Sequence, residues 1–255
     1  MPSGASRGAG RRRLDERLVQ DGLAHSRSHA QALILSGVVL VDDTPVDKAG
    51  RSVPDIATIR LRGEGSRFVS RGGDKLAGAL EDFLLDVSGL TCLDAGASTG
   101  GFTDCLLQAG ARRVFAVDVG RGQIHQKLRG DSRVDLRERV NVRHLEASDV
   151  PEPIELVVAD VSFISLRLLM PAFVRVAPNS RWLLLVKPQF EVGKEKVGKG
   201  GVVREESLRE EAVQSVLEAA ASEGYALTQR ADSQIEGPSG NREIFVLLRR
   251  DQTQS

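Results

Sequence analysis

The sequence predicts an α/β fold in which a mostly parallel sheet follows a small αβ module. From Lys75 onward, apolar strands alternate with helical stretches, and this alternation implies crossover connections in a parallel sheet. The last two expected strands, 225–232 and 244–248, are joined by a loop without a helix, which requires antiparallel pairing. The chain before Lys75 has shorter elements and a different pattern. Two domains are therefore expected.

The small module is expected to contain two helices and two strands. Leu14, Leu18 and Val19 mark a first helix closed by Gly22, and Ser26 is a suitable N-cap for a second. That second helix carries Ala30, Leu33 and Ile34 on one face and ends before Gly37; residues 38–41 and 56–61 are expected strands, with a turn at 42–45.

The expected boundaries follow from composition. Residues 1–10 offer almost nothing to bury and are expected to form a disordered tail. The module then spans 11–62, and a linker with a glycine hinge spans 63–73, at Gly63, Gly65, Gly72 and Gly73.

The large domain is expected over 74–250, before a short tail at 251–255. It opens with a helical stripe of Leu76, Leu80, Phe83 and Leu84. Its expected strands are 91–94, 114–118, 155–160 and 181–187, and its expected helices are 103–108, 166–176 and 207–223.

Composition excludes several classes of protein. The 255 residues contain 35 Lys and Arg against 35 Asp and Glu, so a globally basic nucleic-acid binder is not indicated. No apolar run approaches the roughly 20 residues of a membrane span, and the first residues lack the apolar stretch of a secretory signal. Two cysteines, Cys92 and Cys105, make no disulfide framework. We expect a cytoplasmic protein with no membrane partner.

Four expected strands each end in a charged residue: Asp94, Asp118, Asp160 and Lys187. In open parallel sheets the ligand crevice lies beyond the carboxyl ends of the strands. Glu243 begins the final antiparallel strand, so the topology brings it to the same edge. Charges also mark where buried strands emerge into solvent, but five of them at one edge favour a functional site.

A glycine-rich turn follows the first strand of the sheet. Its Gly-x-x-x-Gly-Gly spacing departs from Gly-x-Gly-x-x-Gly, and no Gly-Lys-Ser/Thr is present, which excludes a phosphate loop. Asp118, at the end of the next strand, is placed to bind ribose hydroxyls of NAD or of S-adenosylmethionine (SAM). The acidic Asp94 disfavours a pyrophosphate and favours the cationic end of SAM. The expected cofactor residues are Asp94, Gly96, Ser98, Thr99, Gly100, Gly101, Phe102 and Asp118.

No metal site is expected. The four histidines are scattered, and His25 and His29 have i,i+4 spacing without acidic or cysteine partners, which is typical of a surface pair.

Two resemblances cover residues 11–250. The pattern from Ser26 to Asp42 resembles the RNA-binding domain named after ribosomal small-subunit protein four. The large domain resembles the TlyA-type hemolysin A family, whose members are described both as hemolysins and as ribosomal RNA 2′-O-methyltransferases. The segments that carry this resemblance are Ser70–Leu76, Leu93–Thr103, Ala159–Leu166, Val186–Glu191 and Gly237–Asn241 with Glu243.

The resemblance implies an FtsJ-like, Rossmann-like SAM-dependent methyltransferase sheet with a catalytic tetrad of Lys75, Asp160, Lys187 and Glu243. A ribose hydroxyl must lose a proton as it is methylated, and Lys187 is the candidate acceptor. Asp160 and Glu243 would then orient the two amines. The sequence Asp160-Val-Ser-Phe lacks the prolines typical of enzymes that methylate base amines.

The implied partner is ribosomal RNA or a ribosomal subunit. Arginines of the small module are expected to contact phosphates: Arg11, Arg12, Arg13, Arg17 and Arg27. A basic loop after Lys187 is expected either to cover RNA or to be an ordinary surface loop; its residues are Lys194, Lys196 and Lys199.

The resulting hypothesis is a SAM-dependent ribosomal RNA 2′-O-methyltransferase. A membrane-acting hemolysin and a noncatalytic RNA-binding assembly factor that retains SAM are the alternatives.

Overall fold

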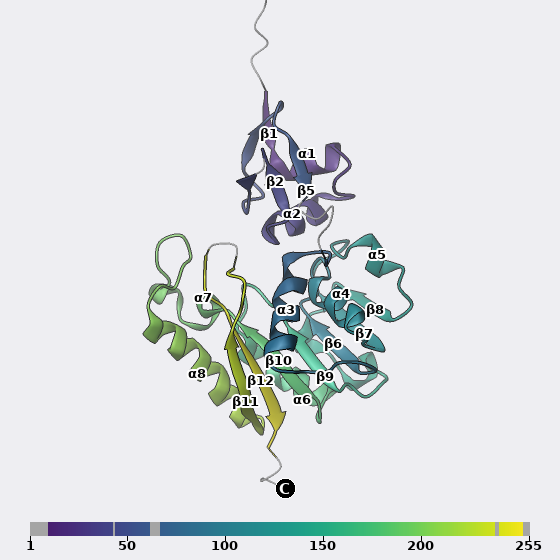
Figure 1. The fold of residues 1–255 in the computed structure, drawn as a ribbon, viewed down its shortest axis with the longest axis vertical. Helices are drawn as coiled ribbons and strands as arrows, with labels where there is room; N and C mark the ends of the chain where they lie inside the picture. Colours follow the sequence, from purple (N-terminus) through teal and green to yellow (C-terminus); the bar gives the residue numbers. More distant parts are fainter. Residues whose placement is uncertain (1–9, 43, 62–66, 238–239, 252–255) are drawn as a thin grey trace, which may run out of the picture.

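The computed structural model describes residues 10–42, 44–61, 67–237 and 240–251. Figure 1 shows a small N-terminal domain above one edge of a larger domain built around a twisted sheet. Two buried clusters fill the larger domain, and a third lies entirely within residues 14–61. Each domain therefore has its own core.

The small domain packs two helices against short strands. Ser26 caps the second helix by accepting a hydrogen bond from the His29 amide at 3.1 Å, and Gly37 follows its end at φ +72°. The strands form an antiparallel pair β1–β4 and a three-stranded sheet in the order β3-β2-β5. The elements are β1 (Arg11–Arg13), α1 (Leu14–Gln20), α2 (Arg27–Leu35), β2 (Val39–Val41), β3 (Thr44–Pro45), β4 (Ser52–Pro54) and β5 (Ile59–Leu61).

Three expectations for the small domain were wrong. The strand expected over 56–61 is shorter, because Ile56 lies in a turn and is 82% exposed. Thr44 and Pro45, expected in a turn, pair with β2, and the strands β1 and β4 were not expected at all. His29 is not on the surface: it is buried and stacks on His25 with ring centroids 4.1 Å apart.

The large domain holds a seven-stranded sheet in the order β11-β12-β10-β9-β6-β7-β8. The pairs from β10 to β8 are parallel, and β12 runs antiparallel to both neighbours, which confirms the mostly parallel sheet with an antiparallel last strand. The strands are β6 (Thr91–Ala95), β7 (Arg113–Asp118), β8 (Val134–Glu138), β9 (Leu156–Ala159), β10 (Arg181–Val186), β11 (Tyr225–Asp232) and β12 (Ile244–Arg250).

Helices cover both faces of this sheet. One face packs against α3 and α4 through residues such as Leu76 and Leu106, and the other against α6 and α8 through Phe173 and Val216. The helices are α3 (Arg71–Asp82), α4 (Gly101–Gln108), α5 (Gln126–Arg129), α6 (Met170–Val176), α7 (Pro188–Glu191) and α8 (Glu206–Ser222). Short 3₁₀ turns lie at Val142–His144, Ala147–Asp149, Leu166–Leu168 and Lys194–Lys196. None of the helices in the described residues is both long and apolar enough to cross a bilayer.

Two expectations at the start of the large domain were also wrong. Gly72 and Gly73, expected in a hinge, lie in the first turn of α3. A β-carbon on Gly73 would lie 2.9 Å from the carbonyl oxygen of Gly101, so the glycine permits close packing of α3 on α4. Leu84, expected on the apolar stripe, lies beyond α3 and is 92% exposed. Gly63 and Gly65 lie outside the described residues.

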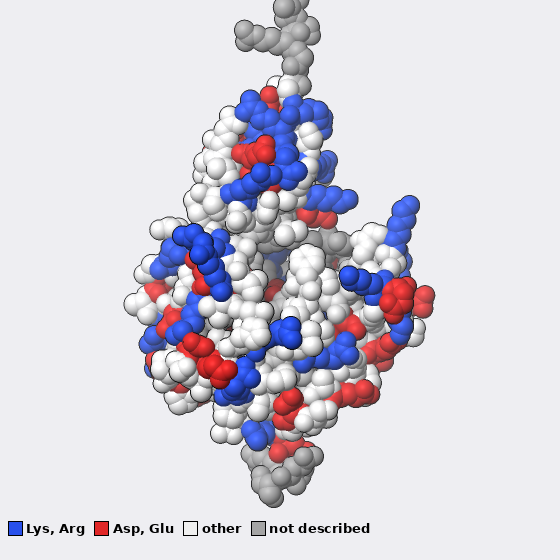
Figure 2. Space-filling model, turned by 180° about the vertical axis from the view of Figure 1, so that it is seen from behind, with Lys and Arg blue, Asp and Glu red and all other residues white. Residues whose placement is uncertain are grey.

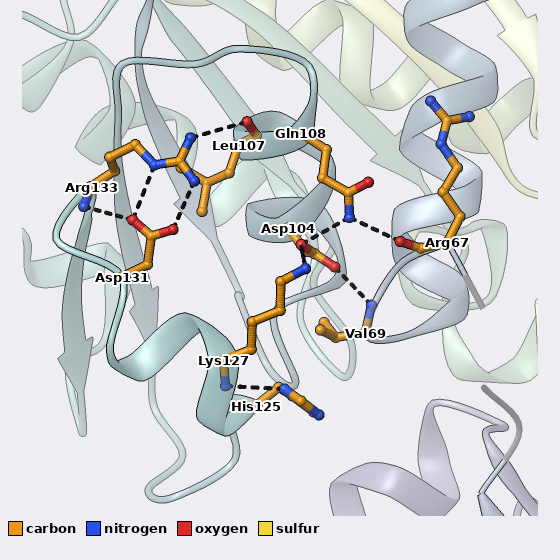
Figure 3. Close-up of polar contacts among 9 residues, drawn as sticks. All are labelled: Arg67, Val69, Asp104, Leu107, Gln108, His125, Lys127, Asp131 and Arg133. Carbon is orange, nitrogen blue, oxygen red and sulfur yellow. Dashed lines mark hydrogen bonds and ion pairs between the residues drawn. The ribbon is translucent and has the colours of Figure 1, made fainter. Parts of the chain in front are cut away.

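Figure 3 shows how the chain entering the large domain is fastened to it. The buried Asp104 carboxylate on α4 accepts hydrogen bonds from the Val69 amide at 2.9 Å and from Lys127 Nζ on α5 at 3.0 Å. Gln108, one turn further along α4, donates to the carbonyl of Arg67 at 2.9 Å. This cluster joins the entering segment to the two helices that flank the glycine-rich turn.

At both described ends of the chain, a residue assigned to a tail makes a backbone hydrogen bond to its domain. Gly10, assigned to the tail, accepts a hydrogen bond from the Asp55 amide at 2.8 Å, and the Asp251 amide donates to the carbonyl of Gly224 at 2.8 Å. Residues 1–9 and 252–255 lie outside the described residues.

Candidate active site

A cavity of about 810 Å³ opens beyond the carboxyl ends of β6, β7, β9 and β10. Its size is ordinary for a small-molecule site. Ser28, Gln31 and Leu35 of α2 line it together with residues of the large domain. The small domain therefore forms one wall of the cavity, which the sequence did not indicate.

Four residues from four different segments form two ion pairs in this cavity. Lys75, in the first turns of α3, lies with Nζ 2.5 Å from Oε2 of Glu243, just before β12, and both side chains are buried. Lys187, after β10, pairs directly with Asp160, after β9. Lys187 Nζ also donates to Ser162 Oγ at 3.0 Å. The residues assigned to the tetrad therefore all line one cavity.

The Lys75–Glu243 pair contributes to the protonation of the Asp160–Lys187 pair. Burial disfavours the charged form of Asp160, but the ammonium groups of Lys187 and Lys75 outweigh it and hold its pKa below the ordinary value. Burial likewise lowers the pKa of Lys187, but Asp160 and Glu243 outweigh it, so this pKa is raised. In the protein without SAM or RNA, the side chain of Lys187 is therefore a protonated ammonium group. The sequence could not decide the direction of this shift.

The glycine-rich turn after β6 makes another wall. Gly96, Ser98 and Gly100 all have positive φ, and the amides of Gly96 and Ala97 donate to the carbonyl of Val117. Asp118 accepts hydrogen bonds from the Ser98 amide at 2.8 Å and the Gly120 amide at 2.6 Å. Asp118 thus holds the turn in shape as well as lining the cavity.

Most of the residues assigned to a cofactor lie on the cavity wall, and two do not. Gly96, Ser98, Thr99, Gly101, Phe102 and Asp118 line it, whereas Asp94 and Gly100 do not. Asp94 lies fully buried behind the turn, where Thr103 Oγ1 donates to its Oδ2 at 2.6 Å. Its Oδ1 has no hydrogen-bond partner among the described residues. Burial, with added repulsion from Asp160 and Asp118, raises the pKa of Asp94 to about 7.

Comparison with known proteins identifies the two domains. The FtsJ-like methyltransferase model matches residues 68–250, and the S4 domain model matches residues 12–55. The chain belongs to the FtsJ-like methyltransferase family. The expected family resemblance and fold class are therefore confirmed.

Individual relatives of this FtsJ-like protein extend over nearly the whole chain. A 16S/23S rRNA (cytidine-2′-O)-methyltransferase TlyA of Mycobacterium tuberculosis is 47% identical over 243 residues, which cover 94% of this chain and 91% of the relative. A solved structure described as a hemolysin from Streptococcus thermophilus superposes with a TM-score of 0.73 at 39% identity, over 96% of this chain and 90% of that one. A SAM-bound magnesium protoporphyrin IX methyltransferase from Synechocystis shares the fold, with a TM-score of 0.51 at 15% identity over 74% and 87% of the two chains.

The arginines of the S4 domain fall into two groups. Figure 2 shows Lys and Arg gathered over one face of this domain. Arg11, Arg12 and Arg13 lie exposed on β1, and Arg27 is 54% exposed. Arg17 is different: its side chain is 11% exposed, and its guanidinium donates to the carbonyls of Pro54 and Asp55 at 3.2 and 3.1 Å. The assignment of Arg17 to RNA contact therefore does not fit the structure, since Arg17 is a buried structural residue.

Asp15 organises two of the exposed arginines. Its carboxylate is fully buried and accepts hydrogen bonds from Arg13, Arg27 and Gln31, each at 3.0 Å. Burial opposes its ionisation, but these donors prevail and hold the pKa of Asp15 below its ordinary value. The basic face of the S4 domain is thus anchored on a buried negative charge.

The basic loop of the FtsJ-like domain lies beside the cavity. Lys194, Lys196 and Lys199 are exposed, and Lys196 pairs with Glu211 on α8. The lysines do not line the cavity, but Val197 and Gly201 of the same loop do.

Asn241, at the end of the family-like segment Gly237–Asn241, fixes this loop to the strand of Glu243. The side chain of Asn241 accepts from the Val203 amide at 2.9 Å and donates to the carbonyl of Gly201 at 2.8 Å. The feature of the sequence that could have indicated this role is the position of Asn241 two residues before Glu243. Within the described ranges, no three His, Cys, Asp or Glu side chains are placed to hold a metal ion.

Proposed function

We propose that this protein transfers a methyl group from SAM to a ribose 2′-hydroxyl of ribosomal RNA in the cytoplasm. The observation that carries the proposal is the convergence of Lys75, Asp160, Lys187 and Glu243 beside a glycine-rich turn in one cavity. The printed activity of the TlyA relative supports the same reaction.

The residues around the turn fit SAM. A β-carbon on Gly96 would lie 3.0 Å from the carbonyl oxygen of Asp160, so only glycine leaves the backbone open at this wall. The buried Asp94 has a pKa raised to about 7, and its ionised form, which a nearby cation would favour, places negative charge behind this wall. That charge suits a sulfonium and an ammonium rather than a pyrophosphate. When bound, SAM supplies an electrophilic methyl group. Gly96, Ser98, Thr99 and Asp118 would hold it.

The ion pairs provide proton transfer and orientation. Lys187 Nζ, once neutral, accepts the proton of the ribose hydroxyl as the oxygen becomes a nucleophile. Its raised pKa means that a proton must first be lost, so turnover increases with pH. Asp160 aims Nζ through the direct ion pair, and Glu243 holds Lys75 at the same edge of the sheet. The four residues thus position the hydroxyl, which is the main requirement of an in-line displacement.

The S4 domain is proposed to capture the RNA. Its exposed arginines, Arg11, Arg12, Arg13 and Arg27, are suited to phosphate contacts that set position without reading bases. Lys194, Lys196 and Lys199 are proposed to contact the RNA backbone on the other side of the cavity.

The test is methylation of purified ribosomal subunits and of free ribosomal RNA by the full chain with labelled SAM, followed by mapping of ribose methylation. Wild type should modify ribose in at least one substrate, and Asp160→Asn should not. SAM binding without methylation of any substrate would instead support a noncatalytic assembly factor. Leakage of dye from liposomes without RNA methylation would support the hemolysin alternative.

A further inference from the structure

The loops that leave β9 and β10 carry one ion pair of the tetrad, and they contact each other again further on. The first contact is the Asp160–Lys187 pair, with Ser162 accepting from Lys187. The second lies further along both segments, where Glu191, the last residue of α7, meets Ser165 and Leu166.

Glu191 is a buried carboxylate that the proposed mechanism does not use. Its side chain is 2% exposed, and it does not line the cavity. Both of its oxygens bind the loop after β9: Oε2 accepts from Ser165 Oγ at 2.5 Å, and Oε1 accepts from the Leu166 amide at 2.8 Å. Arg167 Nε lies 3.5 Å from Oε2. A carboxylate whose two oxygens both bind one neighbouring segment fixes that segment's position and orientation.

The segment that Glu191 holds lacks the backbone hydrogen bonding of a helix or strand, and its other support is the packing of the partly buried Val161 and Ile164 against the core. Residues 160–165 form neither helix nor strand, and Phe163 within them has φ +67°, a conformation unfavourable for a phenylalanine. The ring of Phe163 packs on that of Phe190, with centroids 5.3 Å apart, but is 81% exposed. One end of the segment is fixed by β9, and the other is fixed by Glu191.

We propose that Glu191 is a positioning residue that sets the geometry of the Asp160–Lys187 pair by anchoring the loop after β9. The proposal rests on the proposed methyl transfer, because its consequence is a change in that reaction. The chain of contacts runs from Lys187 through α7 to Glu191, across to Ser165, and back along the loop to Asp160. Glu191 itself does not line the cavity, so the proposal gives it no contact with the reacting groups.

Glu191→Gln is the direct test, because glutamine keeps the shape but has only one acceptor oxygen, which can serve the Leu166 amide. The glutamine NH2 group cannot accept the Ser165 hydroxyl proton, and Ser165 Oγ already accepts from the amide and Nε of Arg167, so it has no lone pair left for a new donor. Single-turnover methylation at saturating SAM and RNA should be slower by about 10-fold to 100-fold, as expected for displaced catalytic groups. The SAM dissociation constant should stay within about twofold, because the glycine-rich turn is untouched. The pH–rate profile should shift to lower pH, since a looser Asp160 raises the pKa of Lys187 less.

Two further variants make the result decisive. Glu205→Gln, the same chemical change at an exposed residue before α8, should leave the rate, the pH profile and the SAM affinity at wild-type values. Ser165→Ala removes one of the two bonds and should slow the reaction less; in the Glu191→Gln background it should add little, because both changes break the same contact. Ser165→Ala also serves if Glu191→Gln does not fold.

The outcomes separate the two proposals. Absence of methylation by wild type would refute the proposed function itself. An active wild type with unchanged rate and pH profile in Glu191→Gln would overturn the positioning role. A Glu191→Gln protein that loses SAM affinity and rate together, with no shift of the pH profile, would show a merely structural role and would also overturn it.

Discussion

Replacing Asp94 with asparagine should make the stability of the FtsJ-like domain less dependent on pH. Asp94 is fully buried, and its pKa is raised from 3.8 to about 7, chiefly by burial. The folded state therefore binds this proton more tightly than the unfolded state does. The stability that results is fully present below the unfolded pKa and is lost as the pH increases through about 7.

The size of the effect follows from the two pKa values. A shift from 3.8 to about 7 corresponds to about 4 kcal/mol in all. Between about pH 5 and about pH 8, the part that is lost is about 2.5 kcal/mol. Asparagine cannot ionise, and its carbonyl can still accept the hydrogen bond from Thr103. The free energy of unfolding of Asp94→Asn should therefore not show this decrease between about pH 5 and about pH 8.

Urea unfolding at the two pH values, without SAM, measures the difference. The single tryptophan, Trp182, is fully buried in β10 and reports on this domain alone. The free energy of unfolding of wild type should decrease by about 2.5 kcal/mol more than that of Asp94→Asn between about pH 5 and about pH 8. Equal decreases in the two proteins would refute the raised pKa of Asp94 in the folded domain.

Three other changes test the remaining roles. Lys187→Arg should slow single-turnover methylation about 10²–10⁴-fold without changing SAM affinity, since arginine keeps the charge but cannot release its proton; near-wild-type rates would exclude Lys187 as the proton acceptor. Gly96→Val should abolish SAM binding in a calorimetric titration, because φ is +91° and a β-carbon would lie 2.9 Å from Val161 Cγ1; unchanged affinity would contradict the placement of SAM at this wall. Removal of residues 1–62 should preserve SAM binding and abolish RNA methylation, and the RNA affinity of the remaining domain should depend less on salt; identical salt slopes would contradict capture by the S4 domain.

Much of the site could be predicted because buried parallel strands constrain where charge appears. Asp160 and Lys187 follow apolar strands, so the sheet topology alone places them at one edge. Glu243 is found by the same reasoning applied to an antiparallel strand. Lys75 has no such signal, because it lies within a helix, and only the family resemblance indicated it.

The errors arose where tertiary contacts override local pattern. Gly72 and Gly73 were interpreted as a hinge, but they allow α3 to approach α4. Strand β8 was missed because Val134–Glu138 is half-buried and carries three charges, which weakens the apolar signal. Arg17 lies four residues after the run Arg11–Arg13, and only the fold shows that its guanidinium is used inside the domain.

The position of Glu243 in the chain also determines when the tetrad can form. Glu243 lies 168 residues after its partner Lys75 and immediately before the last strand. Synthesis proceeds from the N-terminus, and the core of the S4 domain lies within residues 14–61, so this domain can fold long before β12 exists. Until β12 joins β10, Lys75 lacks its carboxylate. A growing chain thus acquires the basic surface of its S4 domain early and the Lys75–Glu243 pair last. With the roles proposed for these residues, the chain could attach to RNA before it is able to modify it.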